Sequence, residues 1–168
     1  TFMARAKANP PKANEAAPAF GRKAVLFAPC FVTSNNPHIG EATPAVLAHN
    51  GVETMVRYPG CCGMPQLEQG NLERVAASAR RAAEELLPLD DQGYDVIALV
   101  PSCALMIKFE WPLILPGDPQ IERLARATFD ISEYVVAIAK KEGLAPGLHM
   151  LPAGVSLYIA FHARAQNM

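Results

Sequence analysis

The stretch Lys23-Ala24-Val25-Leu26-Phe27-Ala28-Pro29-Cys30 carries the clearest fold signal in this chain. Residues 24–28 form a continuous apolar run, which is typical of a strand buried on both faces of a parallel sheet. A proline and Cys30 follow the run directly. We therefore expect a buried strand that ends beside a cysteine.

Three further stretches resemble strands, namely Glu53–Tyr58, Asp95–Val100 and Val155–Phe161. Helical patterns lie between them, and caps, prolines and glycines mark their ends. The predicted helices run from Thr43-Pro44 to Gly51, from Asn71 to Pro88, over 103–110, and from Asp118-Pro119 to Gly143, the last as one helix or as two that meet at a capping box of Asp130 and Glu133.

This alternation of strands and helices predicts the fold class. Strands that are joined by helices imply right-handed crossovers and parallel pairing. We expect an α/β fold of three layers, with a mostly parallel sheet and helices on both faces. A length of 168 residues suits one domain with a substantial core.

The first residues differ in composition from the rest. Residues 1–22 are rich in alanine and proline and show no apolar period, which predicts a basic arm or linker. Residues 23–168 then form the folded domain. Because the chain begins with Thr1 and stops just after a predicted strand, we expect it to be part of a longer polypeptide. The basic residues of the arm region are Arg5, Lys7, Lys12, Arg22 and Lys23.

Composition narrows the class of protein. Apolar residues make up 51% and charged residues 18% of the chain, as in a globular protein. The formal net charge of -1 gives no reason to expect nucleic acid as a partner. No apolar run approaches the roughly 18 residues of a transmembrane helix, and no signal peptide is visible. We expect a cytoplasmic protein, with any association with the membrane face made through partners.

The four cysteines follow the predicted strands. Cys30 comes after the first strand, Cys61 and Cys62 after the second, and Cys103 after the third, while His162 follows the fourth. The carboxyl ends of parallel strands meet at one edge of a sheet, where ligands bind. We therefore expect these residues to gather at one site.

The donor types narrow the chemistry of this site. Vicinal cysteines are poorly placed to bond each other and usually need an outside partner, most often a metal or another redox group. Four thiolates suit a cubane-type [4Fe–4S] centre. Zinc would accept the same four thiolates, or three of them with His162.

The cysteines and their neighbours resemble a known family. Cys30, the run Cys61-Cys62-Gly63, and the run Pro101-Ser102-Cys103-Ala104-Leu105-Met106 together resemble the cysteine-rich CCG domain. This domain occurs in one of the subunits of heterodisulfide reductase, in one of those of the anaerobic glycerol-3-phosphate dehydrogenase, and in iron–sulfur subunits of glycolate and lactate oxidation. The resemblance covers roughly residues 23–168. The segment 162–167 resembles the point where a first repeat leads into a second.

This resemblance implies an electron-carrying iron–sulfur subunit of an oxidoreductase. Such a subunit carries electrons between a flavin-type or ferredoxin-type donor and a disulfide, quinone or similar acceptor. The resemblance implies a [4Fe–4S] cluster on Cys30, Cys61, Cys62 and Cys103, with His162 nearby. It also implies other oxidoreductase subunits as partners and a second repeat in the longer protein.

The sequence departs from the family pattern at two positions. The pattern ends in Cys-x-x-Cys, but Val100 occupies the earlier of these two positions, and only Cys103 remains. Phe161 stands where the family often has cysteine before the histidine. A four-cysteine cluster, a zinc site, and a structural module without a cluster that assembles a larger complex all remain open.

Two other interpretations concern the same residues. Cys103 could act as a lone nucleophile with His162 as its base, but the turn that carries it lacks the flanking glycine of such sites. The cysteines could also be inert buried thiols. Trp111 is interpreted as a core or interface residue rather than an electron relay.

Overall fold

The computed structural model describes residues 2, 6 and 10–166 of the chain. Four parallel strands form one sheet, in the order β2-β1-β3-β4. They are β1 (Lys23–Phe27), β2 (Glu53–Arg57), β3 (Tyr94–Ala98) and β4 (Thr128–Asp130). β1 is a central strand, and Leu26 pairs with Val56 on one side and Ile97 on the other. The predicted buried strand is thus confirmed.

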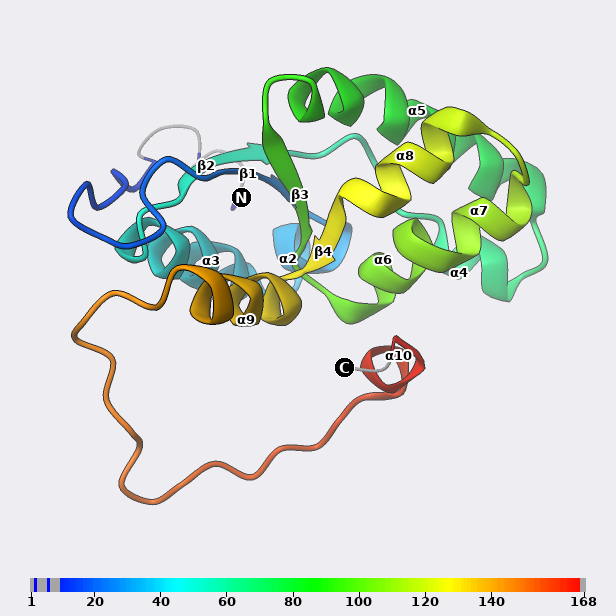
Figure 1. Cartoon of the computed structure of the whole chain (residues 1–168). Helices are drawn as coiled ribbons and strands as arrows, with labels where there is room; N and C mark the ends of the chain where they lie inside the picture. Colours follow the sequence, from blue (N-terminus) through cyan, green and yellow to red (C-terminus); the bar gives the residue numbers. More distant parts are fainter. Residues whose placement is uncertain (1, 3–5, 7–9, 167–168) are drawn as a thin grey trace.

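Helices cover both faces of this sheet (Figure 1). They are α2 (Cys30–Ser34), α3 (Pro37–His49), α4 (Met64–Glu68), α5 (Leu72–Asp90), α6 (Pro101–Leu105), the π-helix η1 (Met106–Glu110), α7 (Trp111–Ile114), α8 (Pro119–Ala127), α9 (Ile131–Lys141) and α10 (Phe161–Ala165). The helix predicted over 103–110 is therefore a run of three short helical pieces, α6, η1 and α7.

The alternation of side chains along β1 divides the core into two clusters. Val25 and Phe27 face α5, α7 and α8, whereas Ala24 and Leu26 face α3 and α9. Each large side chain that is fully buried in this way stabilises the fold by roughly 1.5–3 kcal/mol. The sheet therefore lies between two helical layers, which confirms the predicted three-layer α/β fold.

The prediction of a strand at 155–161 is wrong. The fourth strand is β4, which lies within the stretch that was predicted to be helical from 118 to 143. Asp130 accepts a hydrogen bond from the Ser132 amide at 2.8 Å, and Glu133 accepts one from the Asp130 amide at 3.2 Å. This capping box starts a new helix, α9, and leaves Thr128–Asp130 free to pair with β3.

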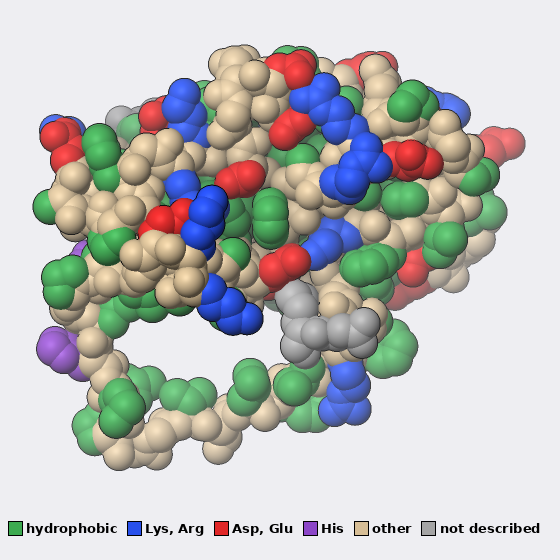
Figure 2. All heavy atoms as spheres, in the orientation of Figure 1, with side chains coloured by type: hydrophobic (Ala, Val, Ile, Leu, Met, Phe, Trp, Pro, Cys, Tyr) green, Lys and Arg blue, Asp and Glu red, His purple; other side chains and the backbone are tan. Residues whose placement is uncertain are grey.

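Residues 144–147 still contact the end of α3, and residues 148–160 follow a path away from the sheet without forming a helix or strand (Figure 1). Residues 155–160 pair with no strand of the described chain, so their high β-propensity has no partner to act on. Val155 is 75% exposed and Tyr158 is 86% exposed. Figure 2 shows hydrophobic side chains along this segment, separated from the body of the molecule.

Two predicted helix boundaries are also wrong, and both involve proline. α3 begins at Pro37, and Pro44 lies inside it, where Thr43 donates its hydroxyl to the Ile39 carbonyl rather than capping. Pro88 lies inside α5 and does not end it. The predicted caps at Asn71 and Asp118 are confirmed, since each side chain accepts a hydrogen bond from an amide in the first turn of its helix.

The described part of the predicted arm packs against the domain. The Asn14 amide donates to the Ala48 carbonyl at 2.8 Å, and Ala17 and Ala19 are buried. Arg22 forms a two-pronged ion pair with Glu142 after α9, at 2.9 Å for the shortest contact. Arg5 and Lys7 lie outside the described residues. In the described part of the chain, no helix has the length and apolar character needed to cross a membrane.

Candidate metal centre

The cysteines lie where the three long strands end. Cys30 is the first residue of α2 after β1, Cys61 and Cys62 lie in the loop between β2 and α4, and Cys103 is in the first turn of α6 after β3. The strand order reverses between β1 and β3, because β1 leads outward to β2 while β3 lies on its other side. A reversal of this kind opens a crevice at the carboxyl ends of the strands. The sheet topology therefore brings the cysteines to one edge.

Two of the sulfurs are in direct contact. Cys103 donates its S–H to the Cys62 Sγ at 3.3 Å, and the two residues are 5% and 4% exposed. This hydrogen bond is the main cause that lowers the pKa of Cys62 to about 7, and the amide of Met64 acts in the same direction against burial. The same contact, together with burial, raises the pKa of Cys103. One thiol of the pair therefore ionises readily, and ionisation of the second thiol is unfavourable.

The other two thiols lie nearer the surface. Cys30 is exposed and Cys61 is half-buried. Partial burial raises the pKa of Cys61, and the charges of Cys62 and Cys30 add to this effect, whereas a hydrogen bond from the Gly63 amide at 3.5 Å opposes it. These mutual effects show that all four thiols share one electrostatic environment.

The loop that carries the doublet is held by two helices beneath it. The Trp111 indole donates its Nε1–H to the Cys62 carbonyl at 3.0 Å, and the Arg81 Nε–H donates to the Pro59 carbonyl at 2.7 Å. Gly63 has a φ of 92°, which favours glycine, and a Cβ there would lie 3.4 Å from Val75 on α5. The loop is therefore fixed before, at and after the doublet.

Tyr58 and Arg81 are site residues that the sequence reasoning missed. Partial burial raises the pKa of Tyr58, and the charges of Cys30 and Cys61 raise it further, whereas Arg81 opposes this rise. Tyr58 could have been found, because it precedes the doublet loop directly. Nothing in the sequence distinguishes Arg81 from its neighbour Arg80.

His162 lies on α10, not at the end of a strand. This helix packs against α6, the helix that carries Cys103, and the Gln166 side chain on its C-terminal side donates to the Pro101 carbonyl at 2.9 Å. The strongest influences on the pKa values of Cys61, Cys62 and Cys103 come from other thiols, backbone groups and burial, and none comes from His162. The structure thus places the four cysteines at one edge of the sheet, with Cys62 and Cys103 in contact, and it places His162 on an adjoining helix. Trp111 is fully buried, as a core residue should be.

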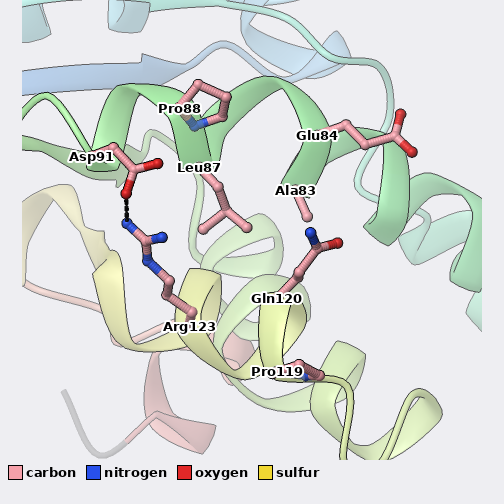
Figure 3. A pocket seen from close by; sticks show the side chains of 8 residues that line it. All are labelled: Ala83, Glu84, Leu87, Pro88, Asp91, Pro119, Gln120 and Arg123. Carbon is pink, nitrogen blue, oxygen red and sulfur yellow. Dashed lines mark hydrogen bonds and ion pairs between the residues drawn. The ribbon is translucent and has the colours of Figure 1, made fainter.

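A separate hollow lies between α5 and α8, with a volume of about 380 Å³ (Figure 3). It is lined by Ala83, Glu84, Leu87, Pro88, Asp91, Pro119, Gln120 and Arg123. Arg123 is paired there with Asp90 and Asp91. None of the lining residues belongs to the cysteine site, so this hollow adds nothing to its chemistry.

A family model of a cysteine-rich domain, designated CCG, matches residues 24–108, a range that contains all four cysteines. The chain belongs to the CCG cysteine-rich domain family. This assignment confirms the predicted family. The β1, β2 and β3 strands and the loops that carry the cysteines all lie within the matched range, except for the first residue of β1.

Similar proteins share the name lactate utilization protein A. The chain is 31% identical over 142 residues to the one from Bacillus pumilus (strain SAFR-032), a match that covers 80% of this chain and 53% of the relative. It is 30% identical over 134 residues to the one from Geobacillus kaustophilus (strain HTA426), which covers 76% of this chain and 53% of the relative. The chain therefore spans about half the length of these relatives. No solved structure matches the chain.

The residues of this CCG domain fit an iron–sulfur group by their donor chemistry. The four cysteines are free thiols, and the lowered pKa of Cys62 makes a thiolate available near neutral pH. Iron–sulfur clusters are held by thiolates of this kind. Within residues 2, 6 and 10–166, no group of three or more His, Cys, Asp or Glu side chains is already arranged to hold a metal ion. By donor type and by position at the strand ends, the residues that fit such a group are Cys30, Cys61, Cys62 and Cys103.

Proposed function

We propose that this chain is the iron–sulfur, electron-transferring part of an oxidoreductase complex, and that its four cysteines hold a [4Fe–4S]-type centre. One observation carries the proposal. The ends of β1, β2 and β3 deliver Cys30, the doublet and Cys103 to the point where the strand order reverses, and two of the sulfurs are already 3.3 Å apart. The family assignment supports the same conclusion.

The chain's own residues prepare the site for a negatively charged group. A cluster, when bound, would supply one-electron transfer between two protein partners. Cys62 and Cys103 lie in the core, where apolar neighbours exclude water, and Cys30 and Cys61 lie toward the surface. The Gly63 amide points at the Cys61 sulfur, and backbone N–H groups of this kind stabilise thiolate charge and tune a cluster's potential. The exposed side of the site is the side that a redox partner can approach.

The proposal also includes the electron donor and the electron acceptor. Electrons would pass between a flavin-type or ferredoxin-type subunit and a disulfide, quinone or similar acceptor. The similar proteins are named for lactate utilization, which agrees with an oxidoreductase complex. The proposal places the subunit in the cytoplasm, with any contact with the membrane face made through its partners. His162 is proposed as an additional ligand or neighbour of the centre, since α10 contacts α6.

The exposed segment 155–161 belongs to the proposed domain organisation. The chain spans about half of its relatives, with 53% coverage in two of them. We propose that residues 23–168 contain a first CCG repeat and that the apolar segment leads into a second repeat. Because the segment 155–161 is a nearly continuous apolar run, we expect it to be buried within a sheet when the second repeat is present.

A zinc-bearing or cluster-free structural module is the second candidate. It is favoured by Val100 and Phe161, which stand where cysteines of the family pattern are expected. Zinc takes four thiolates, or three with His162, at Zn–S distances of about 2.3 Å. In this case the chain would assemble a larger complex without carrying electrons.

Metal analysis of the protein purified without oxygen separates the two functions. The proposal requires iron at near-stoichiometric amounts, with the broad visible absorption of an iron–sulfur cluster. Stoichiometric zinc without iron would establish the structural module instead. Cys103→Ser should lose the iron. Ala104→Ser, which introduces a hydroxyl at the adjacent buried position, should keep it and so controls for damage to the helix.

A further inference from the structure

The side chain of Arg81 is seated on the turn that precedes the doublet. Its Nε donates a hydrogen bond to the Pro59 carbonyl at 2.7 Å. The guanidinium lies over Gly60 so closely that a Cβ on this residue would be 2.8 Å from Nη2 and 3.2 Å from Cζ. Gly60 also has a φ of 120°. The turn and the guanidinium therefore fit together only because residue 60 has no side chain.

This guanidinium carries a positive charge beside the turn. Among the residues that the structure describes, no carboxylate forms an ion pair with Arg81. Its charge instead acts on the Tyr58 phenol, lowering a pKa that the charges of Cys30, Cys61 and Cys62 raise. Arg81 is thus a fixed cation in the same neighbourhood as the thiols.

We propose that Arg81 is a positioning residue for the cysteine doublet, which fixes the Pro59-Gly60 turn and holds one positive charge beside the thiols. The role in charge compensation rests on the proposed function, because it concerns a negatively charged cluster on these thiols. The role in fixing the turn does not depend on a cluster.

The first experiment tests whether Arg81 fixes the turn, by measuring the alkylation rate of Cys62 in metal-free, reduced protein. In a Cys61→Ser background, Cys62 is the only thiol of the doublet, and its alkylation rate reports how often the buried sulfur becomes accessible. Losing a hydrogen bond from a charged donor shifts such an opening equilibrium on the order of tenfold. Arg81→Gln should therefore accelerate alkylation of Cys62 by about that factor. The matched control is Arg80→Gln. It removes the same charge from the adjacent position on α5, which is exposed as Arg81 is but has no described hydrogen bond to the turn, and it should leave the rate unchanged.

The second experiment measures the reduction potential of the iron-loaded protein. A nearby positive charge stabilises the more negative, reduced form of a cluster. Arg81→Gln should shift the midpoint potential to more negative values, while Arg81→Lys, which keeps the charge but not the planar Nε donor, should stay near the parent value. If Arg81 only supported the fold, the midpoint potentials of Arg81→Gln and Arg81→Lys would not differ.

The outcomes of the two experiments distinguish the two proposals. If the parent protein binds no iron, the proposed function fails, and the alkylation rates still test whether Arg81 fixes the turn. If Arg81→Gln matches Arg80→Gln in both alkylation rate and potential, Arg81 has no positioning role. If the alkylation rate changes but the potential does not, the charge compensation is refuted and the mechanical role stands.

Discussion

The Sγ atoms of Cys62 and Cys103 lie 3.3 Å apart, although the two cysteines are 41 positions apart in the sequence. The contact depends on the sheet, because β2 and β3 flank the central strand β1 and end at the same edge. It makes the two thiols chemically unequal. Cys62 is the acceptor with the lowered pKa, and Cys103 is the donor with the raised one.

This inequality predicts the effect of removing the donor. Cys103→Ala should raise the pKa of Cys62 well above about 7, because the hydrogen bond that lowers this pKa most is lost while burial, which raises it, remains. The ultraviolet absorption of the thiolate as a function of pH, in metal-free reduced protein, measures this. Cys30→Ala should leave the pKa of Cys62 near its parent value. An unchanged pKa in Cys103→Ala would refute the contact.

The same pair predicts how stability depends on pH. The folded-state pKa of Cys62 is below its ordinary value of 9.0, so the stability that it contributes is present above pH 9.0 and is lost as the pH falls toward about 7. Cys103 has a raised pKa, so its contribution is lost as the pH rises above its ordinary value of 9.0. Urea unfolding of metal-free protein across this window should show stability rising with pH more steeply than in Cys62→Ala. Parallel curves for the two proteins would contradict the prediction.

The left-handed conformation of Gly63 gives a third prediction. Gly63→Ala and Gly70→Ala, with φ values of 92° and 73°, should each destabilise the protein by about 1–2 kcal/mol. Gly63 follows the doublet directly and its amide donates to the Cys61 sulfur, so strain at this residue reaches the cysteine site, whereas Gly70 lies beyond α4. Iron content should therefore fall in Gly63→Ala alone. Equal iron content in the two variants would show that the loop tolerates the shift.

The ion pair between Arg22 and Glu142 predicts that residues before β1 contribute to stability. Both side chains are 21% exposed, and Arg22 also lies over the Tyr134 ring with its Cζ 5.4 Å from the ring centre. Arg22→Ala should lower the free energy of unfolding by about 1–2 kcal/mol. Arg126→Ala, which breaks an exposed pair with Glu122, should cost no more than about 0.5 kcal/mol. Thermal or urea unfolding measures both, and equal losses would show that the Arg22 pair is only a surface contact.

The extended segment predicts where a protease cuts the folded chain. Tyr158 is 86% exposed in backbone that pairs with no strand of the described chain, whereas Tyr134 in α9 is fully buried. Brief digestion with chymotrypsin should cleave after residues of the segment 155–161 and leave the bond after Tyr134 intact. Mass spectrometry identifies the cut sites. Early cleavage after Tyr134 would contradict the position of α9 in the fold.

The predictable parts of the fold were those that local pattern decides. The apolar run at 24–28 is a strand because burial on both faces demands such a run, and the caps at Asn71 and Asp118 act through side chains next to the amides that they bind. Placing the cysteines after three parallel strands was enough to predict that they lie at one edge of the sheet. The crevice then follows from parallel pairing.

The wrong predictions concern segments whose structure depends on partners distant in sequence, or on local sequence patterns that favour different structures. Val155–Phe161 has the composition of a strand but no neighbour to pair with in the described chain, whereas Thr128–Asp130 pairs with β3 because a capping box interrupts a helical pattern. Pro44 looked like a helix start, but Pro37 starts α3 earlier. Arg81 differs from its neighbours because its guanidinium packs against Gly60, and this contact exists only in the folded chain.

The contact between Trp111 and the Cys62 carbonyl also has a consequence for optical measurements. Trp111 is the single tryptophan of the chain, it is fully buried, and its indole N–H is bonded to the backbone of the doublet. Emission from this one chromophore therefore arises beside the cysteines and nowhere else. Its intensity and wavelength give a built-in optical signal for changes at the doublet, without any label or added probe.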